Sequence, residues 1–139
     1  MPMEKNELTM RELVFAMEFR GKAAPVEGKE NALKARLAGR GPRNETVIFE
    51  SQVLLSGETF NEIGSIDYGG HGRLEFETVG GGHLGPSPVA GLQSGVVSWR
   101  IAKGEGEFVG AEGYITSNFI VSADGDVTDN QYIRMFIPR

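Results

Sequence analysis

The chain has 139 residues, the size of one domain with a single hydrophobic core, and its 40% apolar and 24% charged residues exclude a disordered chain. Its net charge of −5 disfavours nucleic acid and anionic membrane surfaces as partners, because an acidic protein repels both. The absence of cysteine excludes disulfides, thiolate metal sites and cysteine nucleophiles, while twenty glycines spread between apolar runs indicate many turns.

The stretch Met1 to Met10 is polar, and we expect it to be a flexible extension of a single domain that spans residues 1–139. It lacks the apolar core of a signal peptide, and no later run is long and apolar enough to cross a bilayer. The sequence therefore predicts a cytoplasmic protein without membrane contact.

The first forty residues contain one predicted strand and one predicted helix. Glu12–Arg20 is rich in apolar and aromatic residues and is followed by a glycine, which favours a strand. Residues 28–39 carry helix-forming residues, with Leu33 and Leu37 four apart and a glycine at the end. This second pattern predicts one short helix near residues 28–39.

From residue 45 onward, apolar residues recur at every second position, as in half-buried strands. In the segment 45–56, for example, Val47, Phe49, Val53 and Leu55 share one side. The predicted strands that follow are Glu58–Asp67, Gly72–Val79, Ser94–Ala102, Glu105–Gly110, Glu112–Ser122 and Asn130–Pro138. Together with the first strand, the chain has about eight.

The connections between these strands are mostly short and contain glycine, which favours antiparallel hairpins, whereas parallel pairing needs long crossovers. Consecutive antiparallel strands form either a sandwich or a closed barrel, and closure removes the exposed edges. We therefore predict an all-β fold, an eight-stranded antiparallel closed β-barrel whose interior holds a small ligand. The longer segment Gly80–Gly95 is the candidate loop at the barrel mouth.

The last quarter of the chain, Gly104–Pro138, combines a Gly-x-Gly-x-Phe-x-Gly-Ala turn, a strand that starts at a glycine, a second turn and a final strand. This quarter of the chain resembles the closing hairpins of the allene oxide cyclase-like barrels and of related small bacterial proteins in that lipocalin-like group. The resemblance implies the barrel architecture. The plant cyclases of this group act without a cofactor on a lipid held in an apolar cavity, so the resemblance implies a reaction of that kind. It assigns no site residue here.

Polar residues inside apolar strands are the candidates for chemistry, because burying a polar group is costly unless it is paired or used. In Glu112–Ser122, Tyr114, Thr116 and Asn118 share one side, and Ser117 lies on the other. If the first side faces the lumen, Tyr114 and Asn118 are candidate catalytic residues and Thr116 is a ligand contact. If it faces out, all three form a solvated face.

The final strand places Arg134 between Tyr132 and Phe136 on one side. An inward Arg134 is a candidate catalytic residue that clamps a carboxylate through its planar guanidinium, with Tyr132 as a ligand contact. The alternative is a surface arginine stacked on Tyr132.

Glu62 shares the parity of apolar neighbours in its strand, so it is the candidate general base, with a proton affinity raised by desolvation. The alternative is a solvated acid at the barrel edge. Phe49, Phe76 and Trp99 are the candidate apolar contacts of the ligand.

The two histidines, His71 and His83, each follow glycines at strand ends, and we expect them either to converge at one barrel mouth or to lie exposed in turns. His83 is taken as a candidate catalytic residue. A metal site that combines both histidines with Glu58 or Glu62 lacks a diagnostic spacing, so no metal is predicted.

These observations favour a cofactor-independent isomerase, cyclase or lyase acting on a small, largely apolar metabolite, hydrophobic or aromatic, in the barrel lumen. The alternatives are a non-catalytic carrier or sensor of such a molecule, and a barrel filled by its own side chains that serves as an interaction module. No motif of serine hydrolases, nucleotide enzymes or nicotinamide enzymes is present. Apolar residues assigned to strand exteriors, such as Val96 and Ile133, predict a homo-oligomer, a dimer or trimer.

Overall fold

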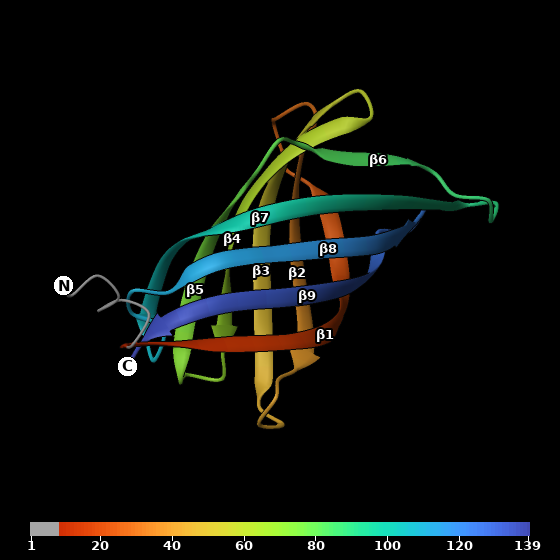
Figure 1. The fold of residues 1–139 in the computed structure, drawn as a ribbon. Helices are drawn as coiled ribbons and strands as arrows, with labels where there is room; N and C mark the ends of the chain where they lie inside the picture. The colour runs from red at the N-terminus through yellow and green to blue at the C-terminus, as the bar shows by residue number, and fades with distance from the viewer. Residues whose placement is uncertain (1–8) are drawn as a thin grey trace.

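The computed structural model describes residues 9–139, which form a closed antiparallel barrel (Figure 1). The strands are β1 (Met10–Pro25), β2 (Ala32–Arg40), β3 (Thr46–Ser56), β4 (Thr59–Tyr68), β5 (Gly72–Thr78), β6 (Gly82–Pro86), β7 (Leu92–Gly106), β8 (Glu112–Ser122) and β9 (Asp126–Pro138). The order β3-β2-β1-β9-β8-β7-β5-β4, with β3 paired to β4, closes a ring of eight, and β6 pairs with β4 and β7 beside it. The prediction of an eight-stranded closed barrel is confirmed.

The expected flexibility of residues 1–8 lies outside the described residues, and Met10 already belongs to β1. Within residues 9–139, no helix is long and apolar enough to cross a membrane.

The barrel consists of two layers, in which β7, β8, β9 and β1 cross β2 to β5 at a steep angle (Figure 1). β1 pairs with β9 along most of its length and with β2 at its end, so it passes from one layer to the other. At Gly21 the neighbouring strand approaches so closely that a Cβ atom would lie 2.1 Å from the Arg36 carbonyl oxygen. Only glycine fits this corner.

The predicted helix near residues 28–39 is wrong, because residues 32–40 form β2 between β1 and β3. Leu33, Ala35 and Leu37 face the barrel interior, while Lys34 and Arg36 are exposed. A spacing of four places two leucines on one face of a helix and equally on one face of a strand. Pairing with β1 and β3 therefore outweighs the local helix propensity of residues 32–40.

The segment 80–95, expected to be a loop, instead contributes β6 and the start of β7. Its glycines make room for aromatic rings: a Cβ atom on Gly82 would lie 2.2 Å from the Phe60 ring, and one on Gly95 would lie 2.3 Å from the Phe119 ring. The predicted strand Glu105–Gly110 is also wrong, since β7 ends at Gly106 and a turn follows.

Aromatic side chains fill the barrel from one end to its middle. Phe15, Tyr68 and Phe108 pack edge to face near the turns at residues 41–45, 69–71 and 107–111, which we call the closed end. In the middle, Trp99 contacts Phe49 and Phe76, with ring centroids 5.5 and 4.4 Å away.

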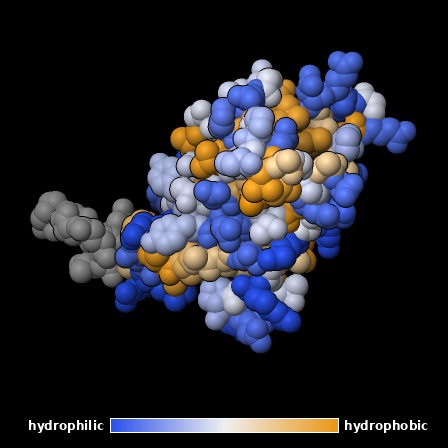
Figure 2. Space-filling model, turned by 90° about the vertical axis from the view of Figure 1, so that its right-hand side faces the viewer, coloured by the Kyte–Doolittle hydropathy of each residue, from blue (hydrophilic) through white to orange (hydrophobic). Residues whose placement is uncertain are grey.

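The opposite end, which we call the open end, carries β6 and the turns at residues 57–58 and 123–125. Figure 2 shows the side of the molecule on which β6 and the β6–β7 turn lie in Figure 1, and apolar groups gather there among polar ones. The interior contains a cavity toward this end.

Candidate functional site

The open end of the barrel contains a cavity of about 150 Å³. Side chains from every strand except β5 line it. Apolar lining residues are Ala23, Leu33, Ala35, Leu37, Phe49, Val53, Leu55, Phe60, Leu84, Trp99, Phe119, Val121 and Val127, and the polar ones are Glu62, Gln93, Ser117 and Asp129. A cavity of this size accepts a molecule with a single six-membered ring.

Asp129 projects from β9 into this cavity and is only 3% exposed. Its carboxylate accepts hydrogen bonds from Ser117 Oγ at 2.5 Å and from Gln131 Nε2 at 2.9 Å. Burial raises the pKa of Asp129 to about 6, and the two hydrogen bonds oppose this rise because they favour the charged form. These bonds leave some of the four lone-pair positions of the carboxylate free.

Glu62 projects from β4 into the same cavity and is 7% exposed. Burial, together with the smaller effect of the nearby Asp129 charge, raises the pKa of Glu62 to about 7. The Ser51 hydroxyl and the Trp99 indole N–H act in the opposite direction, but neither has a partner in hydrogen-bonding geometry among the described residues.

The backbone of Glu62 is fixed by Thr78 of β5, beyond the last paired residues of β4 and β5. The Thr78 hydroxyl accepts a hydrogen bond from the Glu62 N–H and donates one to the Glu62 carbonyl oxygen, both at 2.7 Å. This double contact anchors the strand at the point where the carboxyl group enters the lumen.

The two carboxyl groups form a coupled pair in an apolar enclosure. Each disfavours the ionisation of the other, so the protons belong to the pair rather than to one residue. Because two hydrogen bonds of ordinary geometry stabilise the Asp129 carboxylate, Asp129 ionises first and Glu62 exchanges its proton near neutral pH. Such a pair is suited to general acid–base chemistry.

Four residues expected in the site lie inside the barrel, and three of them line the cavity. Glu62 and the rings of Phe49 and Trp99 line the cavity. Phe76 also faces inward and packs against the Trp99 ring, but it is not among the residues that line the cavity, so its ligand contact stays a prediction.

The other predicted site residues lie on the outside of the barrel, so their assignment to the lumen is wrong. On β8, Ile115 and Ser117 face inward, which places Tyr114, Thr116 and Asn118 on the exposed face. Side chains of a strand alternate between its two faces, and a solvated face of Tyr114, Thr116 and Asn118 was the alternative stated above.

The predicted site residues of β9 also face outward, because Gln131 and Ile133, which have the opposite parity, face inward. Tyr132 is 47% exposed, and the exposed Arg134 forms an ion pair with Glu12 of β1 on the outer surface. Ile133, expected on a strand exterior, is completely buried, whereas Val96 is 52% exposed as predicted.

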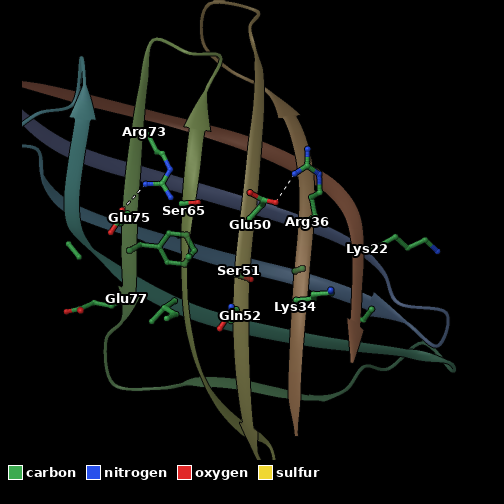
Figure 3. Close-up of a pocket in the computed structure, with 16 residues that line it drawn as sticks. Lys22, Lys34, Arg36, Glu50, Ser51, Gln52, Ser65, Arg73, Glu75 and Glu77 are labelled. Carbon is green, nitrogen blue, oxygen red and sulfur yellow. Dashed lines mark hydrogen bonds and ion pairs between the residues drawn. The ribbon is translucent and has the colours of Figure 1, made fainter. Parts of the chain in front are cut away.

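An open groove of about 900 Å³, larger than the lumen cavity, crosses the outer surface of β1 to β5 (Figure 3). Its charged residues are largely paired with one another: Arg36 with Glu50 at 2.7 Å and Arg73 with Glu75 at 2.8 Å. These side chains are at least 39% exposed, so water competes with any ligand there.

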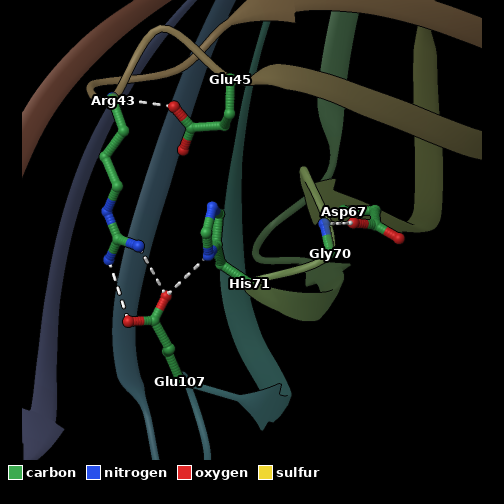
Figure 4. A network of polar contacts seen from close by, with 6 residues as sticks. All are labelled: Arg43, Glu45, Asp67, Gly70, His71 and Glu107. Carbon is green, nitrogen blue, oxygen red and sulfur yellow. Dashed lines mark hydrogen bonds and ion pairs between the residues drawn. The ribbon is translucent and has the colours of Figure 1, made fainter.

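The two histidines lie at opposite ends of the barrel and do not converge. His71 belongs to the closed end, where its Nδ1 is 3.7 Å from Glu107 and Arg43 forms a two-pronged ion pair with the same carboxylate (Figure 4). His83 lies on β6 at the open end and is exposed, whereas its neighbour Leu84 faces the cavity. The expected convergence of the two histidines is therefore wrong, and a catalytic role of His83 at the open end stays a prediction.

No group of three or more potential metal ligands of the His, Cys, Asp or Glu type occurs within residues 9–139.

Asp129, Ser117 and Gln131 were missed at the sequence level. The signal was present, because Val127, Asp129, Gln131 and Ile133 alternate in one register, but the predicted strand began only at residue 130. A polar residue that shares the parity of a long apolar series is the pattern that marks a buried polar group.

No protein-family model matches this chain, and no curated protein matches it. Among solved structures, it is similar to the pterocarpan synthase dirigent protein GePTS1, with a TM-score of 0.68 and 14% identity over 95% of this chain and 91% of that chain. It is also similar to the pterocarpan synthase dirigent protein PsPTS1, with a TM-score of 0.65 and 13% identity over 93% of this chain and 97% of that chain. These likenesses establish a small closed barrel similar to that of dirigent proteins, and not one specific to allene oxide cyclases.

Proposed function

We propose that the barrel binds a small, largely apolar metabolite in the open-end cavity and moves a proton on it without a cofactor, as an isomerase, cyclase or lyase. The observation that carries this proposal is the Glu62 carboxyl group, which lines an apolar cavity, is 7% exposed and has a pKa of about 7.

In the proposed reaction, Glu62 removes a proton from a carbon atom of the ligand and returns it at another position. A desolvated carboxylate is a stronger base than one in water, and a pKa near 7 lets it both accept and release the proton. Within residues 9–139, Trp99 Nε1 and Ser51 Oγ have no hydrogen-bond partner, so they are available to an oxygen atom of the ligand that gains negative charge.

The cavity walls support this assignment, because the rings of Phe49, Phe60, Trp99 and Phe119 exclude water from the carboxyl pair. The solved structures of similar fold also support it, since both are described as pterocarpan synthases. We also propose that the barrel resembles the allene oxide cyclases in acting without a cofactor.

The proposal is tested with a six-membered β,γ-unsaturated ketone, whose isomerisation to the conjugated ketone is followed by ultraviolet absorbance. The wild type should catalyse the shift and should exchange the intervening protons for deuterium in heavy water. Glu62→Gln should abolish both activities, while Glu18→Gln, which changes an exposed glutamate of β1, should retain them. Full activity in Glu62→Gln would show that another group moves the proton.

A carrier is the second candidate, favoured by the predominance of apolar side chains in the cavity wall. Trp99 is the only tryptophan in the chain and lines the cavity, so its fluorescence reports binding directly. A ketone that changes this fluorescence without isomerisation or deuterium exchange would assign the barrel to the carriers.

A homo-oligomer, dimer or trimer, also stays a proposal. Exposed apolar side chains on the outer layer support it, with Val96 52%, Tyr114 57% and Tyr132 47% exposed. Light scattering during size-exclusion chromatography measures the mass directly, and replacing Tyr114 and Tyr132 by serine should reduce it to that of the monomer.

A further inference from the structure

We propose that the natural ligand of the open-end cavity carries a positively charged amine, which pairs with Asp129 while an aromatic or aliphatic ring fills the apolar walls. This inference rests on the proposed function, because it names the ligand class of the same cavity.

The first step is the charge of the cavity. Glu62 and Asp129 are its only ionisable lining residues among positions 9–139, and no Lys, Arg or His of the described chain shares the lining with them. Buried carboxylates are ordinarily paired with a cation, because an unpaired buried charge is costly. The cavity therefore has two acidic groups and, among the described residues, no cationic partner for them.

The second step is that the carboxyl groups retain free hydrogen-bonding capacity. Glu62 is more than nine-tenths buried, and the two donors that act on it, Ser51 Oγ and Trp99 Nε1, have no partner in hydrogen-bonding geometry among the described residues. Asp129 accepts two hydrogen bonds, from Ser117 and Gln131, which hold it in position and leave further lone pairs for a ligand. An ammonium group brings three donors and suits this arrangement.

The third step is the shape and lining of the cavity. At about 150 Å³ it is far larger than a bare metal ion and accommodates a single ring with a short side chain. The rings of Phe49, Phe60, Trp99 and Phe119 add favourable cation–π contacts for an ammonium group. A carboxylate or phosphate ligand is excluded, because it would meet two acids and no cation.

The test compares benzylamine, benzyl alcohol and benzoate, which share one ring and differ in charge, with Trp99 fluorescence as the readout. Benzylamine should bind about tenfold or more tightly than benzyl alcohol, the factor expected for one charge-assisted hydrogen bond, and benzoate should not bind. The affinity for benzylamine should rise with pH as the carboxyl pair ionises between 6 and 7, and that for benzyl alcohol should not.

The variant Asp129→Asn should lose the preference for the amine and still bind the alcohol, while the matched control Asp126→Asn, an exposed residue of the same strand, should behave as the wild type. Because Asp129→Asn can also reduce folding, the melting temperature of each variant is measured with and without ligand.

The outcomes separate the two proposals. If benzyl alcohol binds as tightly as benzylamine, the amine class is overturned and ligand binding in the lumen stands. If neither molecule changes the fluorescence or the melting temperature, single-ring ligands do not enter the lumen, and the proposed function fails together with this inference.

Discussion

Stability of this barrel should fall as the pH rises, because Glu62 must ionise inside the lumen. Its pKa rises from 4.5 in an exposed chain to about 7 in the folded barrel, so the folded state binds the proton more tightly than the unfolded state. Each pKa unit corresponds to about 1.4 kcal/mol, and the fold therefore loses about 3 kcal/mol between these two pH values. The contribution is fully present below pH 4.5 and absent above pH 7.

The variant Glu62→Gln removes this titration and isolates its effect. The free energy of unfolding is measured with urea, using Trp99 fluorescence, for the wild type and the variant across the pH range. The difference between the two curves should change by about 3 kcal/mol in favour of the variant as the pH rises from 4.5 to 7. Loss of the native side chain adds an offset that does not vary with pH.

Glu18→Gln is the matched control, since Glu18 is exposed and its variant should follow the wild-type curve. Parallel curves for the wild type and Glu62→Gln would refute the reasoning, because they would mean that Glu62 has the same proton affinity in the folded and unfolded states.

Three further variants test the packing, the carboxylate partners and the surface. Gly21→Ala should destabilise the fold by about 2 kcal/mol or more in urea unfolding, because its Cβ atom would meet the Arg36 carbonyl oxygen at 2.1 Å; an unchanged midpoint would contradict the corner described for β1. Ser117→Ala should raise the pKa of Asp129, because one donor to the carboxylate is lost. Carbon-detected NMR titration measures this pKa, and an unchanged value would contradict the hydrogen bond. Arg43→Ala should leave the urea midpoint nearly unchanged, since its ion pair is exposed. A clearly lower midpoint would mean that this network holds the closed end together.

The sequence was sufficient to predict the barrel, because the alternation of apolar residues and the short glycine turns both depend on local geometry. Residues 32–40 show where this reasoning fails. The spacing of Leu33 and Leu37 fits a helix and a strand equally, and only pairing with β1 and β3 decides between them.

The candidate site was predicted only in part, because the face of a strand that points inward also depends on how the strands pair. Glu62 was found because a lone acid interrupts an apolar series within a short strand. Tyr114 and Arg134 were misplaced because the parity of β8 and β9 follows from the register of the whole barrel, and a shift of one residue exchanges the two faces. Asp129 was missed because the predicted strand began one residue after it.

The central claim is that the lumen leaves a space beside Glu62 and Asp129 that a guest molecule can occupy. A crystal structure of the protein with benzyl alcohol tests it most directly. We predict density for one molecule at the open end, with its ring against Trp99 and its hydroxyl group within hydrogen-bonding distance of a carboxyl oxygen. A lumen filled by rearranged side chains, with the alcohol found only in the outer groove of β1 to β5, would contradict the claim.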